Sequence, residues 1–145
     1  MKHFLFFFAA LLLITSCNKP FVKKELFEDG SVKSEKTFIK VDGKEELLKE
    51  VVFHPNGKKY IEGNYKNGLR EGYWASWYED GTLWSEGEFR DGESHGKRTV
   101  FHPNGTLYYE GRFEKGKRVG LWKFYDENGN LVNEIDYDKA PEMRN

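Results

Sequence analysis

The chain has 145 residues, of which 38% are hydrophobic and 32% charged, and its formal net charge at pH 7 is -1. Because binding to nucleic acid relies on a basic surface, this balance gives no reason to expect a nucleic-acid partner. The single cysteine, Cys17, excludes an intramolecular disulfide.

The chain begins with an apolar run over residues 4–14. This run is shorter than the roughly 20 residues that span a bilayer, but it has the length of a signal-peptide core. The Ile-Thr-Ser-Cys sequence at 14–17 resembles a bacterial lipobox, whose cysteine is acylated and becomes the mature N-terminus. We therefore predict a lipoprotein signal peptide over 1–16, a lipidated tether over 17–24 and lipidation at Cys17. A free thiol without this role is the alternative.

Glycines recur with a fixed period along the rest of the chain. Gly57, Gly81, Gly105 and Gly129 follow one another at intervals of 24 residues. Three further sets keep this interval: Gly63, Gly87 and Gly111; Gly68, Gly92 and Gly116; and Gly72, Gly96 and Gly120. A period of this length is typical of proteins that stack one supersecondary unit many times. It favours an extended scaffold or binding surface over an enzyme.

Each repeat is predicted to be a β-hairpin. Asn-Gly or Asp-Gly pairs end at Gly57, Gly81, Gly105 and Gly129, and both residues of such pairs tolerate the positive φ of tight turns. Between the turns, residue types alternate with period two, which indicates strands. We interpret residues 44–49 as an irregular strand start and not as a helical turn. The sequence therefore predicts an all-β fold, a single elongated, twisted antiparallel meander sheet of about eight to ten strands built from these repeats.

The repeat domain is predicted over residues 25–137. Its units are placed at about 25–50, 51–74, 75–98, 99–122 and 123–137. The first unit is degenerate, as expected for a repeat that caps the end of a stack. Residues 138–145 are predicted to form a polar tail.

The spaced motifs resemble a known repeat. Gly-x-Tyr-x-x-Gly at 63–68, Gly-x-Phe-x-x-Gly at 87–92 and 111–116, and Gly-x-Trp at 72–74 and 120–122 are similar to the MORN repeat. The spacing and the Asn-Gly-x-x-x-x-Glu-Gly element resemble its bacterial variant, from which proteins labelled as YwqK-family antitoxins are built. The resemblance implies the hairpin fold and, as an expectation, an antitoxin role. The pattern is broken at Lys97-Arg98 and at Ile135.

Five glutamates fall at one register of the repeat: Glu35, Glu62, Glu86, Glu110 and Glu134. Carboxylates that act together as acid and base lie within about 5–10 Å of each other. Each repeat contributes two strands at about 4.8 Å, so successive glutamates are expected roughly 10 Å apart. That separation is too large for a shared proton or a single ion. We therefore favour cross-strand pairing with Lys or Arg over a catalytic role.

No other group of residues predicts chemistry. His54 and His102 are two repeats apart, about 19 Å in a regular meander, and cannot ligate one metal ion. Ser76, Ser85 and Ser94 lie outside any nucleophile motif, and the glycines do not form a phosphate loop. The sequence predicts no catalytic residue, no metal site and no cofactor.

A row of aromatic residues is the best candidate for binding. On one strand face, Tyr60, Trp84 and Tyr108 accompany Glu62, Glu86 and Glu110. Half-exposed rings flanked by carboxylates and lysines suit a glycan, an extended peptide or the surface of a protein. Cross-strand stacking of the rings without any ligand is the alternative.

Together these observations predict a non-enzymatic lipoprotein of the bacterial cell envelope. It would contact the membrane through its lipid anchor and act as a repeat scaffold that binds a protein partner or an envelope glycan. Asn18 favours the outer membrane, because an acidic residue after the lipidated cysteine often retains such proteins in the inner membrane. The alternative is an antitoxin-like protein that neutralises a partner toxin, although a signal peptide argues against a cytoplasmic toxin. An enzyme is disfavoured because almost no chain remains outside the repeats.

Overall fold

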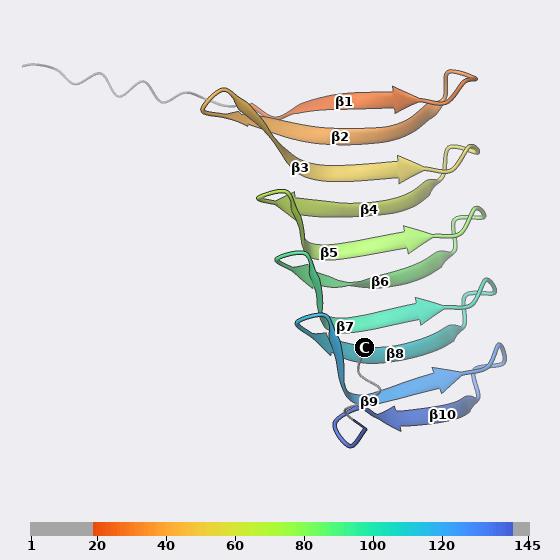
Figure 1. The fold of residues 1–145 in the computed structure, drawn as a ribbon. Coiled ribbons are helices and arrows are strands. Elements are labelled where there is room, and N and C mark those ends of the chain that lie inside the picture. Colours follow the sequence, from red (N-terminus) through yellow and green to blue (C-terminus); the bar gives the residue numbers. More distant parts are fainter. Residues whose placement is uncertain (1–18, 141–145) are drawn as a thin grey trace, which may run out of the picture.

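The computed structural model describes residues 19–140, which form one open sheet of ten antiparallel strands in sequence order. The strands lie one beside the next from β1 to β10 (Figure 1). The predicted all-β meander of hairpins is therefore confirmed. The described residues contain no helix long and apolar enough to cross a membrane. The bounds are β1 Phe21–Leu26, β2 Val32–Val41, β3 Lys44–Phe53, β4 Lys59–Lys66, β5 Leu69–Trp77, β6 Leu83–Arg90, β7 Glu93–Phe101, β8 Leu107–Glu114, β9 Lys117–Tyr125 and β10 Leu131–Asp136.

The structure corrects one boundary of the sequence analysis. The predicted tether over 17–24 overlaps β1, which begins at Phe21 and pairs with β2. The ring of Phe21 stacks on Phe38 with 5.9 Å between centroids, and Lys24 forms an ion pair with Glu35 at 2.7 Å. These contacts hold β1 in register, so the sheet extends further toward the N-terminus than predicted. Cys17 lies outside the described residues.

Two kinds of tight turn join the strands, at opposite ends of the sheet (Figure 1). In the turns of the first kind, both central residues have positive φ, as at Asn67 (52°) and Gly68 (77°). In the turns of the second kind, only the glycine does. Gly57 has φ of 80°, and its N–H donates to the carbonyl of His54 at 2.9 Å. The second kind is followed by a β-bulge, because Phe53 pairs with Lys59 and Val52 with Ile61, so Tyr60 is left unpaired.

On one side of the sheet, glycines alternate with large side chains across successive strands. We call this side the glycine face. Trp74 lies over Gly63 so closely that a Cβ on the glycine would be 2.0 Å from the indole, and Trp122 lies over Gly111 in the same way. Close approach of a ring is a physical reason for glycine inside a strand. The row consists of Gly63, Trp74, Gly87, Arg98, Gly111 and Trp122.

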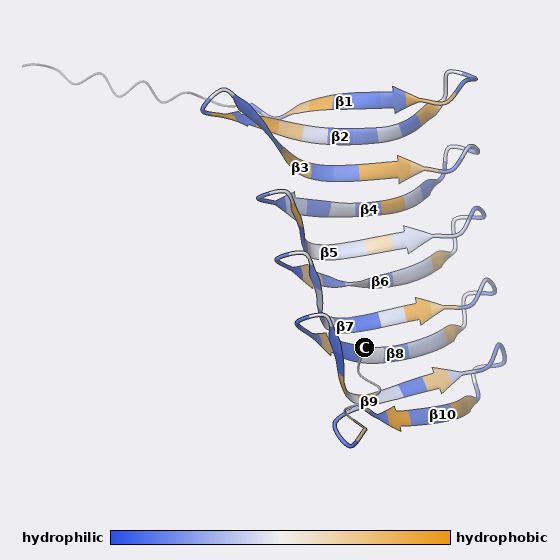
Figure 2. Cartoon of the chain, in the orientation of Figure 1, coloured by the Kyte–Doolittle hydropathy of each residue, from blue (hydrophilic) through white to orange (hydrophobic). Residues whose placement is uncertain are grey.

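Aromatic rings supply most of the apolar contact on the glycine face. Trp122 is only 2% exposed, and its ring centroid lies 5.0 Å from that of Phe113 and 5.6 Å from that of Tyr109. Figure 2 shows hydrophobic colour only in short stretches, clearest near the end of β3, since Trp and Tyr have intermediate hydropathy. The fold therefore depends on contacts of rings with glycines in neighbouring strands, and not on a core between two layers.

Candidate functional site

The five glutamates form a row across the side of the sheet opposite the glycine face. We call this side the glutamate face. One strand separates each glutamate from the next, so the expected spacing of roughly 10 Å holds. In strand order, the row is Glu35, Val51, Glu62, Ala75, Glu86, Thr99, Glu110, Lys123 and Glu134.

Most of these glutamates are paired with lysines of neighbouring strands. Glu62 forms ion pairs with Lys49 and Lys59, and these two ammonium groups lower the pKa of Glu62 below its ordinary value. Glu110 pairs with Lys97 at 2.9 Å. The remaining pairs of the row are Lys24–Glu35 at 2.7 Å and Lys123–Glu134 at 3.8 Å. This arrangement is the cross-strand pairing favoured by the sequence, and it holds each carboxylate beside a lysine instead of beside another carboxylate.

Glu86 differs because it accepts a hydrogen bond from the hydroxyl of Tyr73 at 2.7 Å. Partial burial and this bond raise the pKa of Tyr73 from 10.0 to about 12. Because the folded value is raised, the contact stabilises the fold fully below about pH 10 and is lost as pH rises through about 12. We expect Tyr73→Phe to remove the phenolate absorbance step near pH 12. Tyr60→Phe is the control, and persistence of the step in Tyr73→Phe would contradict the contact.

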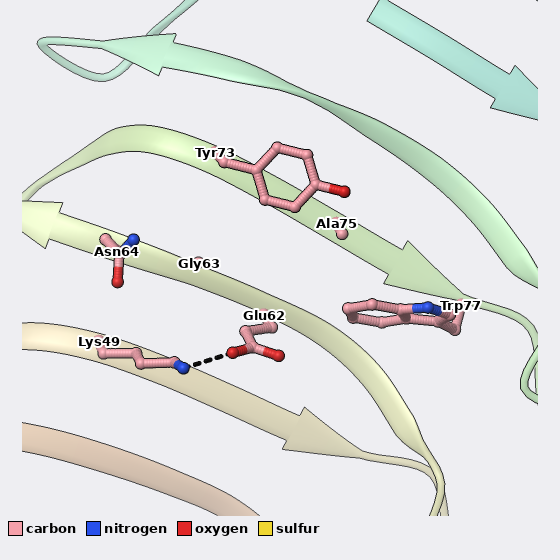
Figure 3. A pocket seen from close by; sticks show the side chains of 7 residues that line it. All are labelled: Lys49, Glu62, Gly63, Asn64, Tyr73, Ala75 and Trp77. Atoms are coloured by element: carbon pink, nitrogen blue, oxygen red, sulfur yellow. Dashed lines mark ion pairs between the residues drawn. The ribbon is translucent and has the colours of Figure 1, made fainter.

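Three shallow hollows lie along the glutamate face, one in each central repeat. Figure 3 shows the first, with a volume of about 190 Å³, in which Tyr73 and Trp77 flank Ala75 on β5. The ion pair between Lys49 and Glu62 faces them from β3 and β4. Ala75 is only 3% exposed, and its small side chain leaves the space between the two rings open.

The hollows share walls and so form one groove. Tyr73 lines the first hollow and also the second, which has a volume of about 160 Å³ and Thr99 among its lining residues. Lys97 lines the second and the third, which has a volume of about 280 Å³ and ends at Leu121 and Lys123. The groove therefore runs across the strands from β3 to β9, perpendicular to the hairpins.

The structure brings the predicted glutamates to this groove, since Glu62, Glu86 and Glu110 each line one hollow. The predicted rings Tyr60, Trp84 and Tyr108 precede these glutamates by two residues, but each is the extra residue of a β-bulge, where alternation of side chains does not hold. They line none of the three hollows. Their exposed fractions are 40%, 40% and 44%.

These three rings occupy β-bulges and pack on turn residues instead of on one another. The ring of Tyr60 lies 5.1 Å from that of His54, and Tyr108 lies 4.7 Å from His102. Trp84 makes the equivalent contact with Tyr78 at 6.0 Å. No ring contact joins one member of the trio to another within residues 19–140. One flank of each ring is thus covered by its own hairpin and the rest is accessible.

His54 and His102 connect successive hairpins. The Nε2 atom of His54 is 2.9 Å from the carbonyl oxygen of Trp77, and that of His102 is 3.0 Å from the carbonyl oxygen of Tyr125. Tyr78, at the equivalent position of the intervening repeat, donates to the carbonyl of Phe101 at 2.9 Å. The described part of the chain contains no cluster of three side chains suited to a metal ion.

Sequence reasoning missed the residues that separate the hollows. Tyr73 and Lys97 form these walls, Leu121 lies at the end of the third hollow, and each of the three follows a glycine of positive φ, such as Gly72 at 68°. Each is the middle residue of a Gly-x-Trp motif or, in the central repeat, of Gly-Lys-Arg at 96–98. The 24-residue period places the three residues at one register. Because they are chemically different (Tyr, Lys and Leu), the sequence does not indicate that they line one surface.

Comparison with known proteins identifies the repeat. The family model of the MORN repeat variant matches four segments, 48–67, 70–91, 94–115 and 118–139, which together make up more than half of the chain. Each segment contains one hairpin, from β3–β4 to β9–β10.

Other comparisons add little. The sequence matches no curated protein. A 1.90 Å crystal structure of a protein of unknown function from Bacteroides fragilis aligns with 82% of this chain and 92% of its own, at 11% identity and a TM-score of 0.28, and this likeness carries no argument. The family match, together with the stacked hairpins, shows that the chain belongs to the MORN repeat variant family and is a repeat scaffold.

Proposed function

We propose that this protein is a lipid-anchored, non-enzymatic scaffold of the bacterial cell envelope that binds an extended protein segment or glycan along the groove of the glutamate face. The observation that carries this proposal is the continuity of the groove, whose three hollows share Tyr73 and Lys97 as walls. Tyr73 and Leu121, which are 54% and 49% exposed, add apolar contact area to a polar rim, as is typical of recognition surfaces.

The anchor belongs to the same proposal and rests on the lipobox-like sequence that ends at Cys17. Only residues 18–20 separate this cysteine from β1, so a lipid on Cys17 would hold the first hairpin close to the membrane. Asn18 favours the outer membrane. Replacement of Cys17 by Ser is expected to move the protein out of the membrane fraction, as measured by detergent-free fractionation and by the mass of the N-terminal peptide.

The binding part is tested by crosslinking in living cells, followed by detergent purification and mass spectrometry. We expect the wild type to retain one stoichiometric partner and the double variant Tyr73→Ala/Leu121→Ala, which truncates exposed walls of the hollows, to lose about tenfold or more of it. Leu69→Ala/Leu131→Ala is the matched control, because these side chains are 47% and 50% exposed but line none of the three hollows. Unchanged capture by a folded Tyr73/Leu121 variant would exclude this surface.

An antitoxin role would use the same groove to hold an exported toxin, and it is motivated by the labels of related MORN-variant proteins. The identity of the crosslinked partner separates the two roles. Co-expression with a captured toxin should restore growth under the antitoxin hypothesis. An envelope protein or glycan as the partner, without any growth effect, would support the scaffold role.

A further inference from the structure

The glycine face contains arginines that have no acidic partner. Arg70, Arg98 and Arg118 lie on β5, β7 and β9, and Arg98 and Arg118 are partly buried. Yet every ion pair found among residues 19–140 uses a lysine and none uses an arginine. A guanidinium group partly removed from water is normally paired with an acid. The contrast with the glutamate face, where four of the five glutamates of the row pair with lysines, points to a missing anion.

Aromatic rings hold these guanidinium groups in place. The guanidinium carbon of Arg70 lies 4.2 Å from the ring centroid of Trp74, and that of Arg118 lies 5.2 Å from Trp122. That of Arg98 lies 5.4 Å from Phe89 and 5.9 Å from Phe113. Such stacking stabilises the cations. The hydrogen bonds at their edges go to neutral hydroxyl groups and not to carboxylates: Arg98 donates to Ser94 and Arg118 donates to Tyr137 at 3.4 Å.

The central arginine occupies an unusual position. Arg98 lies over Gly87, where the flanking repeats have a tryptophan, and a Cβ on that glycine would be 2.7 Å from its Nε. Its Nη2 is 3.3 Å from the Oγ of Ser94, the residue equivalent to Arg70 and Arg118 in the 24-residue period. In this repeat, Ser94 stands at the position of Arg70 and Arg118, and the side chain of Arg98 reaches it. The three guanidinium groups therefore form one row.

The electrostatics of the row also suit an anion. Burial lowers the pKa of Arg98, and the nearby charge of Arg70 lowers it further, but an arginine remains charged at neutral pH. Burial raises the pKa of Tyr109, while the charges of Arg98 and Arg118 oppose this rise. The phenol of Tyr109 therefore lies in the field of both cations, and a bound carboxylate would relieve their mutual repulsion.

We propose that the glycine face binds an acidic polypeptide segment whose carboxylates contact the guanidinium groups of Arg70, Arg98 and Arg118. This site is on the opposite side of the sheet from the groove and does not depend on the function proposed above. The planar guanidinium fork fits a carboxylate with two parallel hydrogen bonds. With a formal net charge of -1, the chain has no general attraction to a membrane or another polyanion, so recognition of individual carboxylates is favoured.

The spacing of the row indicates how the segment would be arranged. Arginines on every second strand are separated by about 10 Å. A polyproline II segment has three residues per turn and advances about 9 Å per turn. An acidic residue at every third position would therefore present one carboxylate to each arginine, and the intervening residues would point to the other sides of the segment.

The probe that tests this is a fluorescent synthetic peptide of repeated Glu-Pro-Pro triplets, titrated with the full-length chain in non-ionic detergent and followed by anisotropy. We expect Arg98→Gln to weaken binding by about tenfold, the loss of one charge-assisted pair. Arg90→Gln, which removes the same charge from an exposed site that lines none of the three hollows, is expected to change affinity by less than about twofold. A peptide of the same composition with contiguous glutamates should bind more weakly.

Arg98→Lys keeps the charge without the planar fork and is expected to bind with an affinity between those of wild type and Arg98→Gln. Circular dichroism establishes that each variant is folded. Equal weakening by Arg98→Gln and Arg90→Gln would overturn the proposal, because only net charge would then matter. It would also be overturned if the folded wild type failed to bind the peptide, or if it bound phosphatidylglycerol vesicles through Arg98 and not the peptide.

Discussion

Replacement of Gly111 by alanine is expected to destabilise the protein by about 3 kcal/mol or more. The added Cβ would be 2.1 Å from Cδ2 of Trp122, well inside contact distance. The indole is rigid and only 2% exposed, so it cannot move aside without leaving its contacts with Phe113 and Tyr109. Urea unfolding followed by circular dichroism measures this loss.

Gly87→Ala is the matched control for this prediction, since Gly87 occupies the same register one repeat earlier. Its Cβ would meet the Nε of Arg98 at 2.7 Å, and this flexible side chain can shift. We expect a cost of about 1 kcal/mol or less. Gly63→Ala, which clashes with Trp74, should resemble Gly111→Ala. A loss for Gly87→Ala as large as that for Gly111→Ala would show that the rigid ring is not the cause.

Trp122→Ala is expected to cost about 3–5 kcal/mol, the range for removing a large buried aromatic side chain. Trp122 packs against Tyr137, with 5.6 Å between ring centroids, and supports the guanidinium group of Arg118. Because repeats are stabilised by their nearest neighbours, β9 and β10 should open before the rest of the sheet. Hydrogen exchange measured by mass spectrometry would locate this loss in residues 117–140.

The control for this second prediction is Trp84→Ala. Trp84 is 40% exposed and has one ring contact, with Tyr78 at 6.0 Å. We expect it to cost about 1 kcal/mol or less, in line with substitutions at exposed sites. If Trp84→Ala destabilised the protein as much as Trp122→Ala, the burial of Trp122 on the glycine face would not explain its larger effect.

Much of the fold followed from local sequence signals. The Asn-Gly and Asp-Gly turns and the glycine period predicted the hairpins and their order, because turn conformation depends on a few neighbouring residues. Residues 44–49 are part of β3, as the strand interpretation required. The start of β1 was missed because the pairing of Phe21 with Phe38 is a contact across strands that no local pattern reports.

The binding surface was predicted less completely than the fold. Period-two alternation placed Glu62, Glu86 and Glu110 on one face, and the structure adds that each lines a hollow. The walls at Tyr73 and Lys97 were not predicted, since these residues are the second members of the two-residue bulges Gly72–Tyr73 and Gly96–Lys97. A bulge changes which residues face each other, and alternation within one strand does not show it.

By itself, the sequence determined the architecture of this protein, because a repeated turn and a repeated strand pattern can only build a stack of hairpins. Tertiary structure alone decided which neighbours meet across the strands. It placed Arg98 over Gly87 among aromatic rings, paired the glutamates with lysines and joined three hollows into a groove. The physical reason is that strand order and turns are local properties of the chain, whereas a surface is formed by residues from different strands, whose register is set by bulges and packing.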